Sequence, residues 1–130
     1  MRVVLGRFSG LFYALMRLMV GLMFAQHGAQ KLFGVLGMGH HVPYMSQVGL
    51  AGGIEFFGGL MIALGLLSSF AAFIASGEMA WAYFQAHAPN SPWPIVNHGE
   101  PAVVYCFVFL YIAAMGSGPY SLDRLLGRKV

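Results

Sequence analysis

Four long apolar stretches occupy most of this 130-residue chain, and three of them contain ionisable residues well inside the run. The stretches span residues 11–33, 48–67, 70–86 and 101–115. A helix needs about 20 apolar residues to cross a bilayer, a length that the first two stretches reach and the last two approach. Charged groups are costly in hydrocarbon, so they face a bundle interior, pair with each other or line a polar pathway. The pattern predicts an all-α membrane protein, a four-transmembrane-helix bundle built around buried polar groups.

Composition supports the bilayer as the solvent for much of the surface. The chain is 58% hydrophobic and 8% charged, whereas a soluble domain has about 25% charged residues. At 130 residues it is expected to be a single domain, residues 1–130. Cys106 is the single cysteine, which excludes an intrachain disulfide and a CxxC pair and favours a packed thiol.

The basic residues predict a membrane topology. Five of the seven Lys and Arg residues lie near the chain ends, outside the apolar stretches, which indicates membrane orientation and not nucleic-acid binding. We expect the first stretch to be a retained helix of a multi-pass inner (plasma) membrane protein. Both termini and a tight turn at Ser68–Ser69 would face the cytoplasm, and loops 34–47 and 87–100 the outside. Gly49 and Gly53 form a GxxxG pair that indicates either tight packing within the bundle or a dimer seam.

The ionisable residues inside the apolar stretches are expected to lie at successive depths along the helix bundle. His27 and Lys31 are four residues apart and share a helical face. Arg17 projects near that face at a deeper level, and Glu55 and Glu78 fall between the depths of Arg17 and His27. In one interpretation these groups are structural ion pairs, with Arg17 and Glu78 as the clearest members, that fix the helix register.

In a second interpretation the outer groups bind a ligand. His27, Lys31, Glu55 and Glu100 would line one outward-opening pocket for a quinone headgroup or another small amphipathic molecule. His27 can donate to a quinone carbonyl, and Glu55 or Glu100 can exchange the proton that accompanies reduction.

A third interpretation is a metal site built from the outward His and Met residues. Imidazole and thioether groups suit copper, but their spacing matches no recognised metal-binding pattern, so we predict no metal. The residues considered are Met38, His40, His41, Met45, His87 and His98.

Taken in order, four motifs resemble the DoxX/DoxD-like family of small membrane proteins, and the likeness covers almost the whole chain. The closing motif departs from the usual family form, which is closer to Gly-Pro-Gly followed by Ser-Leu-Asp, because the proline is displaced to Pro119. The motifs are Arg17…Gly21…His27-Gly28-x-x-Lys31-Leu32, Glu55-x-x-Gly58-Gly59…Gly65, Glu100-x-Ala102…Tyr105 and Gly116-Ser117-Gly118-Pro119-Tyr120-Ser121-Leu122-Asp123.

The resemblance implies a four-helix inner-membrane protein associated with redox chemistry. Some members of the family are subunits of quinone-linked oxidoreductases, including thiosulfate oxidation complexes, and another resembles a membrane partner of redox-defence enzymes. The sequence shows no redox-cofactor motif, so electrons would come from a partner protein or a bound quinone. The leading prediction is a membrane subunit of a redox complex. The alternative is a non-enzymatic assembly or scaffold protein that anchors a partner.

Overall fold

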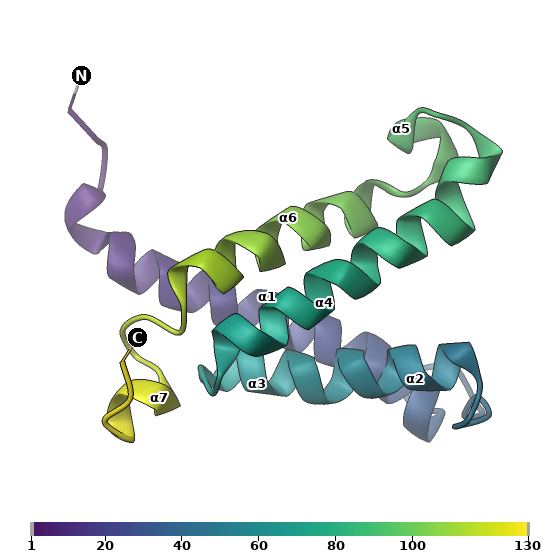
Figure 1. Ribbon diagram of the computed structural model, residues 1–130, viewed down its shortest axis with the longest axis horizontal. Coiled ribbons are helices and arrows are strands. Elements are labelled where there is room, and N and C mark those ends of the chain that lie inside the picture. The colour runs from purple at the N-terminus through teal and green to yellow at the C-terminus, as the bar shows by residue number, and fades with distance from the viewer. Residues whose placement is uncertain (1, 130) are drawn as a thin grey trace.

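The computed structural model describes residues 2–129, which form helices and no strand (Figure 1). This confirms the all-α prediction. Two helical segments, Gly6–Phe33 and Gln47–Leu64, are long and apolar enough to cross a membrane, and Glu100–Met115 is a shorter apolar helix. The elements in chain order are η1 (Gly6–Phe8), α1 (Ser9–Phe33), α2 (Gln47–Gly53), η2 (Ile54–Gly58), α3 (Gly59–Leu64), α4 (Ser68–Ala82), η3 (Tyr83–His87), η4 (Ala88–Asn90), α5 (Pro94–Asn97), α6 (Glu100–Met115) and α7 (Leu122–Leu125).

The first helical pair consists of α1 and the segment in which α2, η2 and α3 follow one another without a break. Glycine lets the two backbones nearly touch. A Cβ atom on Gly59 would lie 2.6 Å from the backbone nitrogen of Ala25 and 2.6 Å from the carbonyl oxygen of Gly21. Gly28 approaches the backbone of Phe56 in the same way, one heptad further along α1. Such close approach is how small residues hold helices together in lipid.

The GxxxG pair noted in the sequence, Gly49 and Gly53, does not lie in this seam. Gly49 lies under the backbone of Pro43 and Tyr44 in the loop before α2, and a Cβ on Gly53 would meet nothing within 4 Å. The prediction that Gly49 and Gly53 pack tightly inside the bundle is therefore wrong for Gly53, and Gly49 packs against a loop and not a helix.

The second helical pair consists of α4 and α6, which lie side by side. Ser76 donates a hydrogen bond to the carbonyl oxygen of Cys106 at 2.8 Å, and half-buried Cys106 sits in this seam. Together the two pairs enclose the apolar core. The buried core residues are Phe24, Ile62, Ala71, Ala72, Ala75, Met79, Phe109 and Ile112.

Arg17 ties the first pair to the chain that follows α6. Its side chain is 2% exposed and donates to the carbonyl oxygens of Ile62 at 3.0 Å, Ser117 at 2.6 Å and Tyr120 at 2.9 Å. A planar guanidinium with five N–H donors suits several acceptors at once. The predicted ion pair between Arg17 and Glu78 is therefore wrong. Backbone carbonyl groups near the end of α3 and in the segment after α6 satisfy the arginine in place of a carboxylate.

Asp123 completes this closed end of the molecule. Its Oδ2 accepts from the Ser117 hydroxyl at 2.6 Å and from the backbone N–H of Leu67 at 2.8 Å. The turn between the second and third long segments spans Gly65–Leu67, with Gly65 at φ 74°. The turn predicted at Ser68–Ser69 is displaced, because Asp123 caps the chain at Leu67 and both serines already belong to α4.

The two pairs meet near the termini and diverge toward the other end. Figure 1 shows α7 and the N-terminal segment at one end, and the loop before α2 and the short helix α5 at the other. Phe24 of α1 joins the pairs midway, with its ring centroid 4.7 Å from that of Phe109 and 5.6 Å from that of Tyr105. Beyond Phe24 the diverging pairs leave room for a cavity.

Candidate functional site

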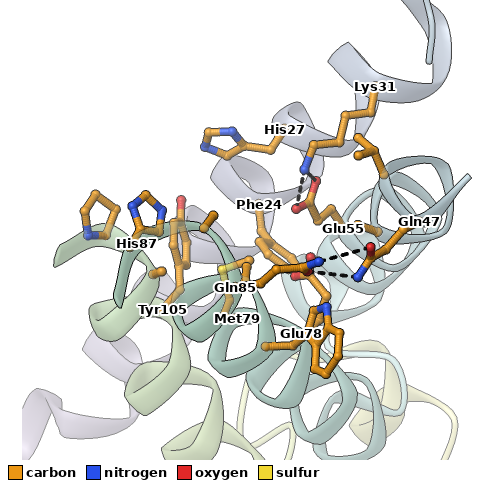
Figure 2. Close-up of a pocket in the computed structure, with 17 residues that line it drawn as sticks. Phe24, His27, Lys31, Gln47, Glu55, Glu78, Met79, Gln85, His87 and Tyr105 are labelled. Carbon is orange, nitrogen blue, oxygen red and sulfur yellow. Dashed lines mark hydrogen bonds and ion pairs between the residues drawn. The ribbon is translucent and has the colours of Figure 1, made fainter. Parts of the chain in front are cut away.

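A cavity of about 540 Å³ lies between the two pairs, with Phe24 on its wall (Figure 2). All four long helical segments contribute to it, and apolar residues such as Val48, Met79 and Trp81 make up much of the rest of the wall. Its volume falls within the range of small-molecule sites. The polar lining residues are His27, Lys31, Gln47, Glu55, Glu78, Gln85, His87 and Tyr105.

An ion pair between Lys31 and Glu55 forms one wall. The Lys31 ammonium lies 2.7 Å from Oε1 and 2.6 Å from Oε2 of Glu55. Glu55 is 2% exposed, whereas the Lys31 side chain is 27% exposed. The pair joins the two helices of the first pair, and the more exposed lysine keeps contact with the cavity mouth. A buried carboxylate is tolerated here because a cation is bonded to both of its oxygens.

Two π-helical turns shape the cavity. The turn η2 carries Glu55, and the turn η3 carries Gln85 and His87. A π-helical turn inserts one extra residue into a helix and is frequent at functional sites. Gln85 and Gln47 form a reciprocal pair of hydrogen bonds at 2.9 and 3.3 Å, which joins η3 to the start of α2. These turns therefore aim side chains of both pairs at the same space.

Glu78 lines the cavity from α4. Its Oε2 is buried and has no hydrogen-bond partner among residues 2–129. Sequence reasoning assigned Glu78 to a structural pair with Arg17, which instead lies at the closed end. A buried carboxyl oxygen without a hydrogen-bond partner is costly, so a proton on the carboxyl group or a donor from a ligand would stabilise Glu78.

His27 lies above Tyr105 in Figure 2, and the two rings meet edge to face, with centroids 6.4 Å apart and nearly perpendicular planes. His27 is exposed, so it marks the open side. Figure 2 places His87 beside Tyr105 and the Lys31–Glu55 pair on the other side. A ring-shaped molecule entering here would meet aromatic faces and polar groups together.

The structure brings His27, Lys31 and Glu55 into one cavity but not Glu100. Glu100 is exposed at the start of α6 and is absent from the lining, whereas the next residue, Pro101, is part of it. The prediction that Glu100 lines the same pocket is wrong, because its first-turn position directs it away from the cavity. Sequence reasoning missed Tyr105, which lies on α6 one turn further in, although the family motif contained it.

The metal interpretation was tested for the His, Cys, Asp and Glu residues. Among residues 2–129, no group of three or more His, Cys, Asp or Glu residues is placed to hold a metal ion. His41 instead stacks on Tyr44 with ring centroids 4.6 Å apart, and His87 faces the carbonyl oxygen of Asn97.

Fold and cavity define a small all-helical protein with apolar outer faces and a polar internal site. A family model described as DoxX matches residues 12–88. The chain is 36% identical over 131 residues to an uncharacterized protein of Haemophilus influenzae, an alignment that covers 96% of this chain and 98% of that protein. No solved structure matches the chain. The chain belongs to the DoxX family, as its motifs predict.

Proposed function

We propose that this chain spans the cell inner membrane as a four-helix bundle with both termini in the cytoplasm. Large apolar side chains cover its outer faces, including Phe70 at 67% exposed, Phe73 at 63% and Phe107 at 64%. A soluble monomer rarely exposes apolar surface on this scale. In lipid the same faces are solvated and the polar groups are kept inside. The Lys and Arg residues near both chain ends favour the cytoplasmic side of the membrane for the two termini.

Within that bundle, we propose that the cavity binds the ring headgroup of a quinone-like molecule and that the protein serves as a membrane subunit of a redox complex. The observation that carries this proposal is the convergence of His27, Lys31, Glu55 and Tyr105 on one cavity with an otherwise largely apolar lining. Ligand sites combine such a lining with a few placed polar groups. An amphipathic quinone could enter from the bilayer, while electrons come from a partner protein.

The polar groups have separate roles in this proposal. His27, on the open side, hydrogen-bonds a headgroup oxygen. Glu55 exchanges the proton that accompanies reduction or oxidation, and the Lys31 ammonium stabilises its ionised form. Tyr105 and Phe24 supply the aromatic walls against which a ring packs.

Binding of a quinone analogue by the purified protein in mild detergent tests the proposal. His27→Ala should weaken binding by about tenfold, the effect of one lost hydrogen bond. Glu55→Gln should also weaken binding, because Lys31 loses the anionic partner that holds this wall of the cavity in place. Glu100→Gln removes a carboxylate of the same kind outside the cavity and should leave binding unchanged. If folded His27→Ala and Glu55→Gln proteins bind as the parent does, the proposal is wrong.

A second candidate function is a non-enzymatic scaffold that anchors a partner. The two-point contact between Lys31 and Glu55 favours it, because a saturated ion pair can serve helix register alone. Under this account, Glu55→Gln would lower thermal stability and partner capture, and no quinone would bind the parent protein.

A further inference from the structure

A second hollow, a groove of about 520 Å³, lies at the closed end of the molecule, where α4 begins beside α7 (Figure 1). Its lining combines large apolar side chains with basic ones. Phe70 and Phe73 of α4 are exposed, and Arg128 and Lys129 come from the chain beyond α7. The groove shares no lining residue with the cavity between the two helical pairs.

The basic side chains of the groove keep most of their hydrogen-bonding capacity. Arg128 makes one long contact, 3.4 Å from its Nη1 to Oδ1 of Asp123, and its side chain is 47% exposed. A guanidinium has five N–H donors, so most of them stay available. Asp123 is bonded more closely to Ser117 and to the backbone N–H of Leu67. Lys129 is exposed. The groove therefore offers two cations to an anionic ligand.

The start of α4 adds neutral donors to the same groove. Ser68 lines it and is fully buried, and the Ser68 hydroxyl has no hydrogen-bond partner among residues 2–129. The side chain before it, Leu67, does not cap the helix. The N-terminus of a helix carries partial positive charge and favours anions. An unsatisfied hydroxyl, a helix N-terminus and two cations thus belong to one groove.

We propose that this groove binds the phosphate of an anionic phospholipid headgroup. Arg128, Lys129 and the Ser68 hydroxyl donate to the phosphate oxygens, and the acyl chains lie along the exposed phenylalanines. The inference rests on the proposed insertion into the membrane but requires no quinone. A general attraction of basic chain ends to anionic lipid would not distinguish Arg128 from Arg124, which lies at the same end but outside the groove. A built site does distinguish them.

Native mass spectrometry of the purified protein in mild detergent measures how tightly the first lipid binds. The two lipids compared are dioctanoyl phosphatidylglycerol, which is anionic, and dioctanoyl phosphatidylcholine, which is zwitterionic and has the same acyl chains. The parent protein should bind phosphatidylglycerol about twentyfold more tightly, since each of two cations near an anionic headgroup contributes roughly fivefold. Inorganic phosphate at the same concentration should not displace it, because phosphate has no acyl chain for the apolar part of the groove.

Variants assign the preference to the groove. Arg128→Gln/Lys129→Gln should reduce the preference for phosphatidylglycerol to less than about threefold. Arg2→Gln/Arg124→Gln removes the same charge from the chain ends but outside the groove, and it should keep the full preference. Ser68→Ala should weaken both lipids by about fivefold, the effect of one net hydrogen bond, because both carry a phosphate. This hydroxyl has no partner among residues 2–129, so its removal should leave the protein folded.

Four results would each overturn the inference. They are equal binding of the two lipids by the parent protein, displacement by inorganic phosphate, the same preference in the two double variants, and unchanged binding by Ser68→Ala. None of them bears on membrane insertion or on quinone binding, so the proposed function would stand.

Discussion

Two basic residues of α1 are held in different ways, and the chemistry of each side chain explains the difference. Arg17 spreads its N–H groups over backbone carbonyls at the closed end, whereas Lys31 places one compact charge between the two oxygens of Glu55. A guanidinium suits several fixed acceptors, and an ammonium suits a single anionic partner. Arg17 is therefore a structural residue, and Lys31 belongs to the cavity.

Replacing Arg17 with alanine should lower the free energy of unfolding by about 3 kcal/mol, because buried carbonyl groups lose their donors. Arg17→Lys should recover only part of this loss, since a lysine cannot reproduce the planar fork. Reversible unfolding of the purified protein in detergent measures both changes. Arg124→Ala, at an exposed site, is the matched control and should change stability by less than about 0.5 kcal/mol.

The same measurement separates Arg17 from Glu78. Because Arg17 bonds to carbonyls and Glu78 lines the cavity, the effects of Arg17→Ala and Glu78→Ala should add within about 0.5 kcal/mol in the double variant. A double variant clearly more stable than the sum predicts would show that the two residues pair after all.

At the scale of elements, the glycine seam between α1 and α3 sets how closely the first pair packs. Gly58 and Gly59 are neighbours in sequence but differ in surroundings. A Cβ on Gly59 would sit 2.6 Å from backbone atoms of α1, while one on Gly58 would meet nothing within 4 Å. Adjacent positions on one helix therefore carry opposite constraints.

We expect Gly59→Ala to lower the free energy of unfolding by about 2 kcal/mol through overpacking against α1. Gly58→Ala should be neutral or stabilising by up to about 1 kcal/mol, since alanine is the better helix former and has room. Thermal unfolding of the two variants in the same detergent checks the contrast. Equal destabilisation by both would mean that the seam does not limit packing.

Much of the element layout could be predicted from the sequence, since all four apolar stretches became long helical segments. The residues at which the helices begin and end were harder to predict. The second stretch was expected to reach residue 67, but Gly65 adopts φ 74° and ends α3 at Leu64. Asp123, near the C-terminus, stabilises this turn by accepting a hydrogen bond from the backbone N–H of Leu67. A local sequence pattern cannot predict a contact between residues so far apart in the chain. Ser68 and Ser69 resemble a turn but begin α4.

The cavity was only partly predictable for a related reason. Helical spacing placed His27 and Lys31 on one face, and estimated depth placed Glu55 near them. Depth alone does not say which way a side chain points around its helix, so Glu100 was wrongly included. The sequence interpretation considered only charged side chains as partners for Arg17 and therefore paired it with Glu78. The structure shows that its partners are backbone carbonyl oxygens.

At the scale of the whole molecule, the basic residues near both termini predict that the termini face the cytoplasm. In a Cys106→Ser background, an impermeant maleimide applied to intact cells should label Met45→Cys and not Leu125→Cys. Both positions are highly exposed, at 93% and 82%, so accessibility within the fold does not differ greatly. Leu125→Cys should react once the membrane is permeabilised. Labelling of Leu125→Cys in sealed cells would reverse the proposed topology.

The central claim is that the space between the two helical pairs holds a lipid-soluble ring molecule. Ala82 lines that space and is half-buried, so Ala82→Trp fills the cavity without removing a polar group. Ala114→Trp, on an exposed position of α6, is the control for adding a large side chain.

The most direct measurement is mass spectrometry of the lipid-soluble molecules that copurify with each protein from a mild detergent extract. We expect a quinone or hydroquinone, near one per chain, in the parent protein and in Ala114→Trp, and its loss from folded Ala82→Trp. The claim would be contradicted by equal retention in Ala82→Trp, or by a folded parent protein that carries no such molecule and takes none up when it is supplied.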